Sequence, residues 1–154
     1  MSDLVSTILI GVALVLVLVL SVFVQGWRTR RAPIGKVVGI ASDVRHNEKL
    51  CENYDEGHVP GRFRTGAWDK HREKVDFLPV ELRNDLKNLF EQASELNVTI
   101  DTARKLGLTG YVSPGDVEKL KAPLASCKDS LREWVYANMN NPAYLPKKRG
   151  LFRR

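Results

Sequence analysis

The sequence predicts an all-α protein: a single N-terminal transmembrane helix followed by a small cytoplasmic helical bundle that contains a long antiparallel α-hairpin. An uncharged apolar run near the N-terminus predicts the first part. Apolar repeats with alternating spacings of three and four residues in the C-terminal half predict the second. Because the chain has only 154 residues, its polar part can bury one modest core and is too short for a multi-domain enzyme.

Residues 1–26 form the predicted membrane anchor. The run from Leu4 to Val24 contains 21 residues and no charged side chain. At 1.5 Å per residue, a helix of this length spans about 31 Å, close to the roughly 30 Å hydrocarbon core of a bilayer. A cleaved signal peptide would begin with a basic region, whereas Asp3 precedes this run. We therefore expect an anchor that is not removed.

Residues 27–36 form a basic juxtamembrane segment, which predicts the orientation of the anchor. Trp27 lies where aromatic residues contact the membrane interface, and Arg28, Arg30 and Arg31 follow it directly. The N-terminal flank has no lysine or arginine. Because positive residues stay on the cytoplasmic side, we expect a single-pass protein of the cell membrane with its N-terminus outside and its C-terminal domain in the cytoplasm.

Residues 37–139 are the predicted helical domain, and its first helix covers residues 34–55. Pro33 separates this helix from the anchor because its ring removes a backbone donor. Apolar side chains then recur at roughly helical spacing, at Val37, Ile40, Ala41, Val44, Cys51 and Tyr54. Residues 56–76 contain several glycines and a proline among scattered charges, which indicates a long irregular loop.

Two apolar repeats predict helices over residues 79–106 and 114–138. The first repeat consists of Leu82, Leu86, Leu89, Ala93, Leu96, Ile100 and Ala103, and the second of Val117, Leu120, Leu124, Cys127, Leu131 and Trp134. Neither helix can bury its apolar stripe alone, so the two are expected to pack as an antiparallel hairpin.

The connection between these two helices has its own stop and start signals. Gly107 favours the end of the first helix, and Ser113, Pro114 and Asp116 favour a start of the second that resembles a capping box. Pro123 lies inside the second helix, where its missing hydrogen bond predicts a kink or an interruption.

The loop carries basic and aromatic side chains that allow two interpretations. In one, Arg62, Arg64 and Trp68 contact a ligand or lipid headgroups. In the other, Phe63 and Trp68 pin the loop onto the helices while the charges face water.

Residues 140–154 form a basic C-terminal tail. Lys147, Lys148 and Arg149 are candidate membrane-interface residues, because residues 147–154 of the tail combine five positive charges with two apolar residues. A tail that is only solvated is the alternative. Since the net charge of +6 is concentrated beside the anchor and in this tail, it does not favour nucleic acid as a partner of the folded domain.

No arrangement of reactive residues predicts catalysis, a metal or a cofactor. The candidate groups are Cys51, Cys127, His46, His58 and His71. Their spacing matches no zinc-site or catalytic motif, so we expect a protein that is not an enzyme and holds no cofactor or metal. Asn97-Val-Thr99 spells a glycosylation sequon, but its place inside a predicted cytoplasmic helix argues against its use.

These features predict a membrane-anchored helical interaction or scaffold protein, acting as an accessory subunit or docking module of a membrane-associated complex. The expected partners are the lipid bilayer and either another protein or a second copy of the chain. Residues of the two apolar repeats that remain uncovered would form the interaction surface. The alternative is a membrane-tethered module that binds phosphate or nucleic acid through the loop 57–74 and the tail.

Overall fold

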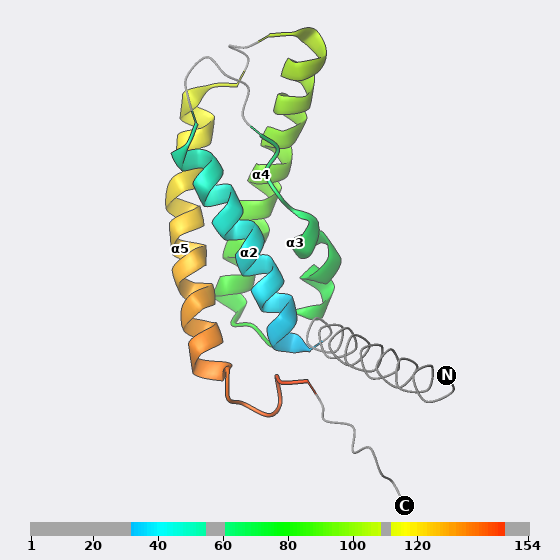
Figure 1. The fold of residues 1–154 in the computed structure, drawn as a ribbon, viewed down its shortest axis with the longest axis vertical. Coiled ribbons are helices and arrows are strands. Elements are labelled where there is room, and N and C mark those ends of the chain that lie inside the picture. The colour runs from blue at the N-terminus through cyan, green and yellow to red at the C-terminus, as the bar shows by residue number, and fades with distance from the viewer. Residues whose placement is uncertain (1–31, 55–60, 109–111, 147–154) are drawn as a thin grey trace, which may run out of the picture.

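The computed structural model describes residues 32–54, 61–108 and 112–146, and all regular structure in these ranges is helical (Figure 1). The elements are α2 (Pro33–Glu52), α3 (Gly66–His71), the short 3-10 helix η1 (Arg72–Lys74), α4 (Val80–Leu106) and α5 (Pro114–Asn138). The prediction of an all-α domain is confirmed for this part of the chain. The predicted anchor 1–26 lies outside the described residues, and no helix within them is long and apolar enough to cross a membrane.

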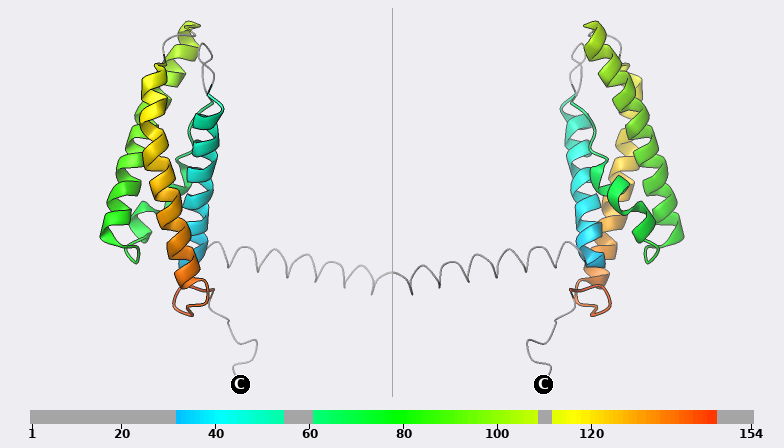
Figure 2. Two further views of the ribbon diagram at one scale, coloured as in Figure 1. Left: turned by 90° about the vertical axis from the view of Figure 1, so that its left-hand side faces the viewer. Right: turned by 90° about the vertical axis from the view of Figure 1, so that its right-hand side faces the viewer.

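The three long helices form the body of the bundle. The helices α4 and α5 run in opposite directions, and α5 packs against both α2 and α4. The helices α2 and α4 diverge, and α3 lies between them (Figure 2). The helix α5 is therefore the central helix of the array, and the segment before α4 fills the opening between the outer two.

The two apolar repeats are buried inside this array. Every member of the first repeat is buried, and every member of the second is buried except Trp134, which is half-buried. On α2, the side chains of Val37, Ile40 and Val44 are fully buried and belong to the same core. Trp134 is thus the one member of the repeats that stays partly uncovered, so the repeats leave little surface of their own for the expected interaction.

The ends of α4 and α5 follow most of the predicted signals. Gly107 adopts a left-handed conformation with φ 65°, which favours glycine, and the next amide, Leu108 N, donates to Ala103 O at 3.0 Å. Ser113 is the N-cap residue of α5, but its side chain makes no capping hydrogen bond. The predicted capping box is therefore absent, and Asp116 instead pairs with Lys119 at 3.0 Å.

The predicted interruption at Pro123 is also absent. The helix α5 continues through this residue, from Pro114 to Asn138. The residue whose carbonyl loses its partner is Lys119, four positions earlier, and it is exposed. Water can reach that turn, so the missing hydrogen bond does not force the helix to end.

The prediction of an irregular loop over 56–76 was wrong for its second half. Residues 66–74 form α3 and η1. Trp68 and Phe63 are 6% and 3% exposed, and the ring of Trp68 stacks on Phe90 with centroids 5.5 Å apart. Burial of these two aromatic side chains supplies the apolar contacts that hold a short helix which would not be stable alone.

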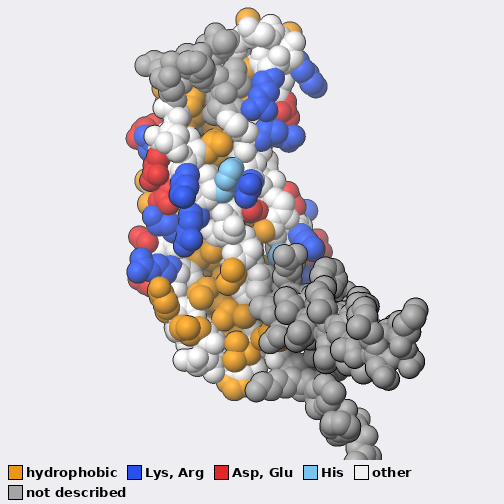
Figure 3. Space-filling model, viewed as in Figure 1, with side chains coloured by type: hydrophobic (Ala, Val, Ile, Leu, Met, Phe, Trp, Pro, Cys, Tyr) orange, Lys and Arg blue, Asp and Glu red, His pale blue; other side chains and the backbone are white. Residues whose placement is uncertain are grey.

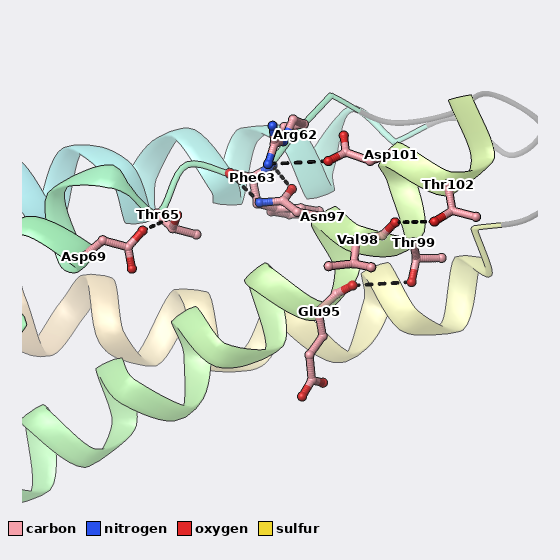
Figure 4. A network of polar contacts seen from close by, with 10 residues as sticks. All are labelled: Arg62, Phe63, Thr65, Asp69, Glu95, Asn97, Val98, Thr99, Asp101 and Thr102. Carbon is pink, nitrogen blue, oxygen red and sulfur yellow. Dashed lines mark hydrogen bonds and ion pairs between the residues drawn. The ribbon is translucent and has the colours of Figure 1, made fainter. Parts of the chain in front are cut away.

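Two buried asparagines hold segment 61–65, which has no regular secondary structure, between α2 and α4. From α4, Asn97 accepts from Phe63 N at 2.7 Å and donates to Phe63 O at 2.9 Å (Figure 4). From α2, Asn47 accepts from Arg64 N at 2.7 Å and donates to Arg64 O at 2.8 Å. We call these four hydrogen bonds the polar clip. Each side-chain amide accepts from the N–H and donates to the C=O of one residue, which is the hydrogen-bonding pattern that a neighbouring β-strand would provide.

The polar clip also explains why the Asn97 sequon is a poor glycosylation site. Asn97 is 6% exposed, and both its donor and its acceptor are engaged by Phe63. A glycan on this amide would have to replace those bonds and enter the core.

Candidate functional site

The base of the bundle is the end at which α2 begins and α5 ends. Tyr144, six residues after α5, brings the chain back to the first turn of α2, where Ile34 N donates to Tyr144 O at 3.2 Å. The rings of Phe77, Trp134 and Tyr144 pack together here, with centroids 5.2 to 5.6 Å apart. The chain towards the predicted anchor and the chain towards the basic tail therefore leave the bundle at the same end.

Three exposed apolar side chains lie at this base. Val38 on α2, Tyr136 on α5 and Met139 just after α5 are 53%, 62% and 47% exposed. We call them the basal patch. Figure 3 shows hydrophobic side chains gathered at this end, below a band of lysine and arginine side chains. Exposed apolar groups that collect at one place mark a contact surface more often than the same groups scattered singly.

A groove between α2 and α5 runs upward from the basal patch. Its lower part is lined by Val38, Ala41, Leu131 and Val135, and its upper part by charged residues of both helices. Lys128 of α5 pairs with Glu48 of α2 across it.

The remaining charges of the groove are mainly positive. Arg45, Lys49 and Arg132 line it, with Glu52 as the other acidic residue of the lining. The guanidinium of Arg132 lies over the ring of Tyr136, 5.6 Å from its centroid. The groove therefore has an apolar lower part bordered by Arg132, and an upper part in which Arg45, Lys49 and Lys128 outnumber Glu48 and Glu52.

The predicted contact residues of the loop do not form one site. Arg62 is exposed and pairs with Asp101 of α4 at 3.5 Å (Figure 4). Arg64 is exposed, and its backbone is held by the polar clip. Trp68 is buried on Phe90. Phe63 and Trp68 thus hold the loop on the helices while the arginines face water, as the second interpretation of the loop expected.

The other predicted interface residues lie outside the described part of the chain. They are Trp27, Arg28, Arg30 and Arg31 before α2, and Lys147, Lys148 and Arg149 after residue 146. The described residues begin at Ala32 and end at Pro146, next to these two groups in the sequence.

Cys51, Cys127, His46 and His71 are the candidate reactive residues that the structure describes. Burial raises the pKa of Cys51 and of Cys127 to about 11, so both thiols stay protonated near neutral pH. Burial, together with Lys70, Lys36 and Lys74, lowers the pKa of His71. Within the described ranges, no three histidine, cysteine or acidic side chains are grouped so that they could hold a metal ion. His58 lies outside these ranges.

A second depression beside Trp68 has a mixed lining. It is formed by α3, η1 and α4, and it includes Asp69, Arg72, Arg83, Lys87 and Glu91. Two of its cations are already paired, because Arg83 contacts Asp76 at 3.1 Å and Lys87 contacts Glu91 at 3.9 Å. Such mutual neutralisation gives no preference for a ligand of one charge.

The chain matches no protein-family model, and no curated protein or solved structure shows detectable similarity to it. The basal patch and the groove are therefore interpreted from their own chemistry. The sequence did contain a signal for both: Val38 and Tyr136 are apolar residues outside the core spacing, close to the ends of their helices.

Proposed function

We propose that the protein is a single-pass, membrane-anchored helical interaction or scaffold protein. Its bundle lies in the cytoplasm and acts as an accessory subunit or docking module of a membrane-associated complex. The observation that carries this proposal is the shared exit of both chain ends at the base of the bundle, marked by the hydrogen bond from Ile34 N to Tyr144 O. The base of the bundle is attached to the membrane, and the surfaces along its long helices remain accessible to a partner.

The length of the connection limits how far the bundle can lie from the membrane. Ala32, at the start of α2, is six residues after Gly26, the last residue of the predicted anchor. A chain of that length covers at most about 21 Å when fully extended. The base of the bundle is therefore held next to the bilayer, with the juxtamembrane arginines between the two.

The groove between α2 and α5 is the surface we assign to the protein partner. The apolar repeats are already mostly buried, whereas the groove has an apolar lower part and a rim on which Arg45, Lys49 and Arg132 outnumber Glu52. A partner helix with an apolar face and acidic flanking residues fits this lining, because amphipathic helices commonly bind in grooves of this kind.

The experiment that tests this function is photo-crosslinking in the cell's own membranes. A photoreactive residue replaces Ser42, which lines the groove, or Lys105, an exposed residue of α4, as the matched control. We expect a defined protein adduct from position 42 and none from position 105. Arg45→Glu combined with Lys49→Glu should abolish this adduct, because both basic rim charges are reversed.

Two results would contradict the proposed function. One is release of the chain from membranes by alkaline carbonate, which removes peripheral proteins and leaves spanning ones. The other is an adduct at position 42 that survives both charge reversals, since the groove would then not be the recognised surface.

The alternative of a phosphate- or nucleic-acid-binding module receives less support. Arg62 is engaged by Asp101, and the ring of Trp68 is buried, so a stacking platform for bases is absent from this part of the loop. No contact among the described residues brings Arg62 and Arg64 to one ligand position.

A further inference from the structure

We infer that the basal patch is a lipid-contacting surface, in which Val38, Tyr136 and Met139 enter the interfacial layer of an anionic bilayer. This inference rests on the proposed membrane anchoring and adds to it a second, non-covalent contact made by the bundle itself. It assigns Val38, Tyr136 and Met139 to lipid and leaves the rest of the groove, from Ala41 upward, to the protein partner.

The first argument is that these three side chains are not needed by the core. The buried residues of α2 near the base are Val37 and Ile40, and Val38 points away from them. The aromatic cluster of Phe77, Trp134 and Tyr144 already closes the lower end of the bundle. The basal patch therefore adds apolar surface outside a completed core.

The second argument is the position of the patch relative to the chain that leads to the anchor. Val38 is six residues after Ala32, so it lies only about 9 Å along α2 from the start of the helix. With a connection of at most about 21 Å from Gly26, the bundle can place this surface directly on the bilayer. An apolar patch at the opposite end of α2 would be a further 20 Å or so away.

The third argument is the chemistry around the patch. A tyrosine ring with an arginine over it, as Tyr136 and Arg132 form at 5.6 Å, suits the headgroup layer, where aromatic rings and cations are both favoured. Arg45 lies seven residues beyond Val38, or about 10 Å higher on α2. Apolar groups below and cations above match the layering of an anionic membrane surface.

The test uses the full chain in vesicles of phosphatidylcholine with a minor fraction of phosphatidylserine. Met139→Cys carries an environment-sensitive fluorophore, and Val98→Cys is the matched control, since Val98 is an exposed apolar residue far along α4 from the base. Labelling at neutral pH selects the introduced thiol, because Cys51 and Cys127 are buried with pKa values of about 11. Nitroxide-labelled lipid then serves as the quencher.

We expect quenching at position 139 to exceed quenching at position 98 at least about threefold. Adding Val38→Asp and Tyr136→Asp should lower the quenching at position 139 to the value at position 98. Adding Val98→Asp to the chain labelled at position 139 should leave its quenching unchanged. Equal quenching at both positions in the unmodified background would overturn the inference. The inference would also be overturned if the fluorophore at position 139 reported an apolar environment but was not quenched by nitroxide-labelled lipid, because protein and not lipid would then cover the patch.

Carbonate extraction of the same vesicles separates the two proposals. A chain that stays in the vesicles but shows no quenching at position 139 is anchored without a basal lipid contact, so only this inference fails. A chain that is extracted has no anchor, so the proposed function and this inference fail together.

Discussion

Two segments outside the long helices are held against the bundle by different interactions. Segment 61–65 is held by the polar clip, the four hydrogen bonds that Asn47 and Asn97 make with the backbone of Arg64 and Phe63. Segment 139–146 is held by ring contacts of Tyr144 and one backbone hydrogen bond to Ile34. Polar groups in the interior are costly when they lose a partner, whereas ring contacts at a half-exposed surface weaken gradually. The first attachment should therefore respond far more steeply to mutation.

The largest effect is expected for Asn97→Ala. The substitution leaves the N–H and C=O of Phe63 without partners at a buried position, which should lower the free energy of unfolding by about 2–5 kcal/mol. Urea unfolding of the detergent-solubilised chain, followed by circular dichroism, measures this loss. A loss below about 1 kcal/mol would mean that water replaces the amide and that the position is not effectively buried.

Asn97→Asp provides a pH-dependent control for the same site. A protonated carboxyl group has one donor and one acceptor, as the amide does, but a carboxylate has no donor. Burial raises the folded-state pKa of this carboxyl group above its unfolded value of about 3.9. The interaction is then fully present below that unfolded pKa and is lost as pH rises through the folded-state pKa. Relative to the unmodified chain, Asn97→Asp should recover stability in acid, and Asn97→Ala should not.

A smaller loss is expected for Asn47→Ala. Asn47 is itself fully buried, but its partner Arg64 is exposed, and water can reach the freed backbone groups more easily. We expect a loss of about 1–2 kcal/mol and faster hydrogen exchange at the Arg64 amide. Asn53→Ala is the matched control, because Asn53 makes an exposed hydrogen bond to Lys49 O. Equal losses for the two variants would contradict the role of the clip.

The helices were predictable because their signals are local and periodic. The structure places α4 at Val80–Leu106 and α5 at Pro114–Asn138, close to the predicted 79–106 and 114–138. The apolar repeats indicate which face of each helix is buried, even when the helix that packs against it is not known. The first helix, predicted over 34–55, ends slightly earlier at Glu52.

The polar clip was not predictable, because its partners have no fixed spacing. Asn47 interrupts the apolar stripe of α2, and Asn97 belongs to a sequon, and neither feature of the sequence indicates a buried polar contact. Their partners are backbone atoms 17 and 34 residues away, and any residue type supplies such atoms. For the same reason α3 was missed, since its stability depends on Trp68 meeting Phe90.

The candidate site was predictable in outline only. The basic segments beside the anchor and in the tail are evident from the charge distribution. That Ile34 and Tyr144, which lead towards these two segments, meet at one end of the bundle follows from the fold. For the basal patch, the helical spacing already placed Val37 and not Val38 on the buried stripe, but that Val38, Tyr136 and Met139 lie at one end of the bundle depends on how the helices pack.

At the base, Tyr144→Ala should lower the free energy of unfolding by about 1 kcal/mol. The variant loses the ring contacts with Phe77 and Trp134 but keeps the backbone carbonyl that accepts from Ile34 N. Hydrogen exchange at the Ile34 amide should quicken, while exchange at the Phe63 amide should not change. Tyr144→Phe keeps the ring and should behave as the unmodified chain. A loss as large as that of Asn97→Ala would remove the contrast between the two attachments.

The smallest effect is expected for Asp101→Asn, beside the polar clip. Asp101 pairs with Arg62 at 3.5 Å, but their side chains are 37% and 61% exposed, so water and salt screen the attraction. We expect the free energy of unfolding to fall by less than about 0.5 kcal/mol. Urea midpoints compared at low and high salt measure the difference. A loss above about 1 kcal/mol at both salt concentrations would show that the ion pair, and not the buried amide of Asn97, holds segment 61–65 on α4.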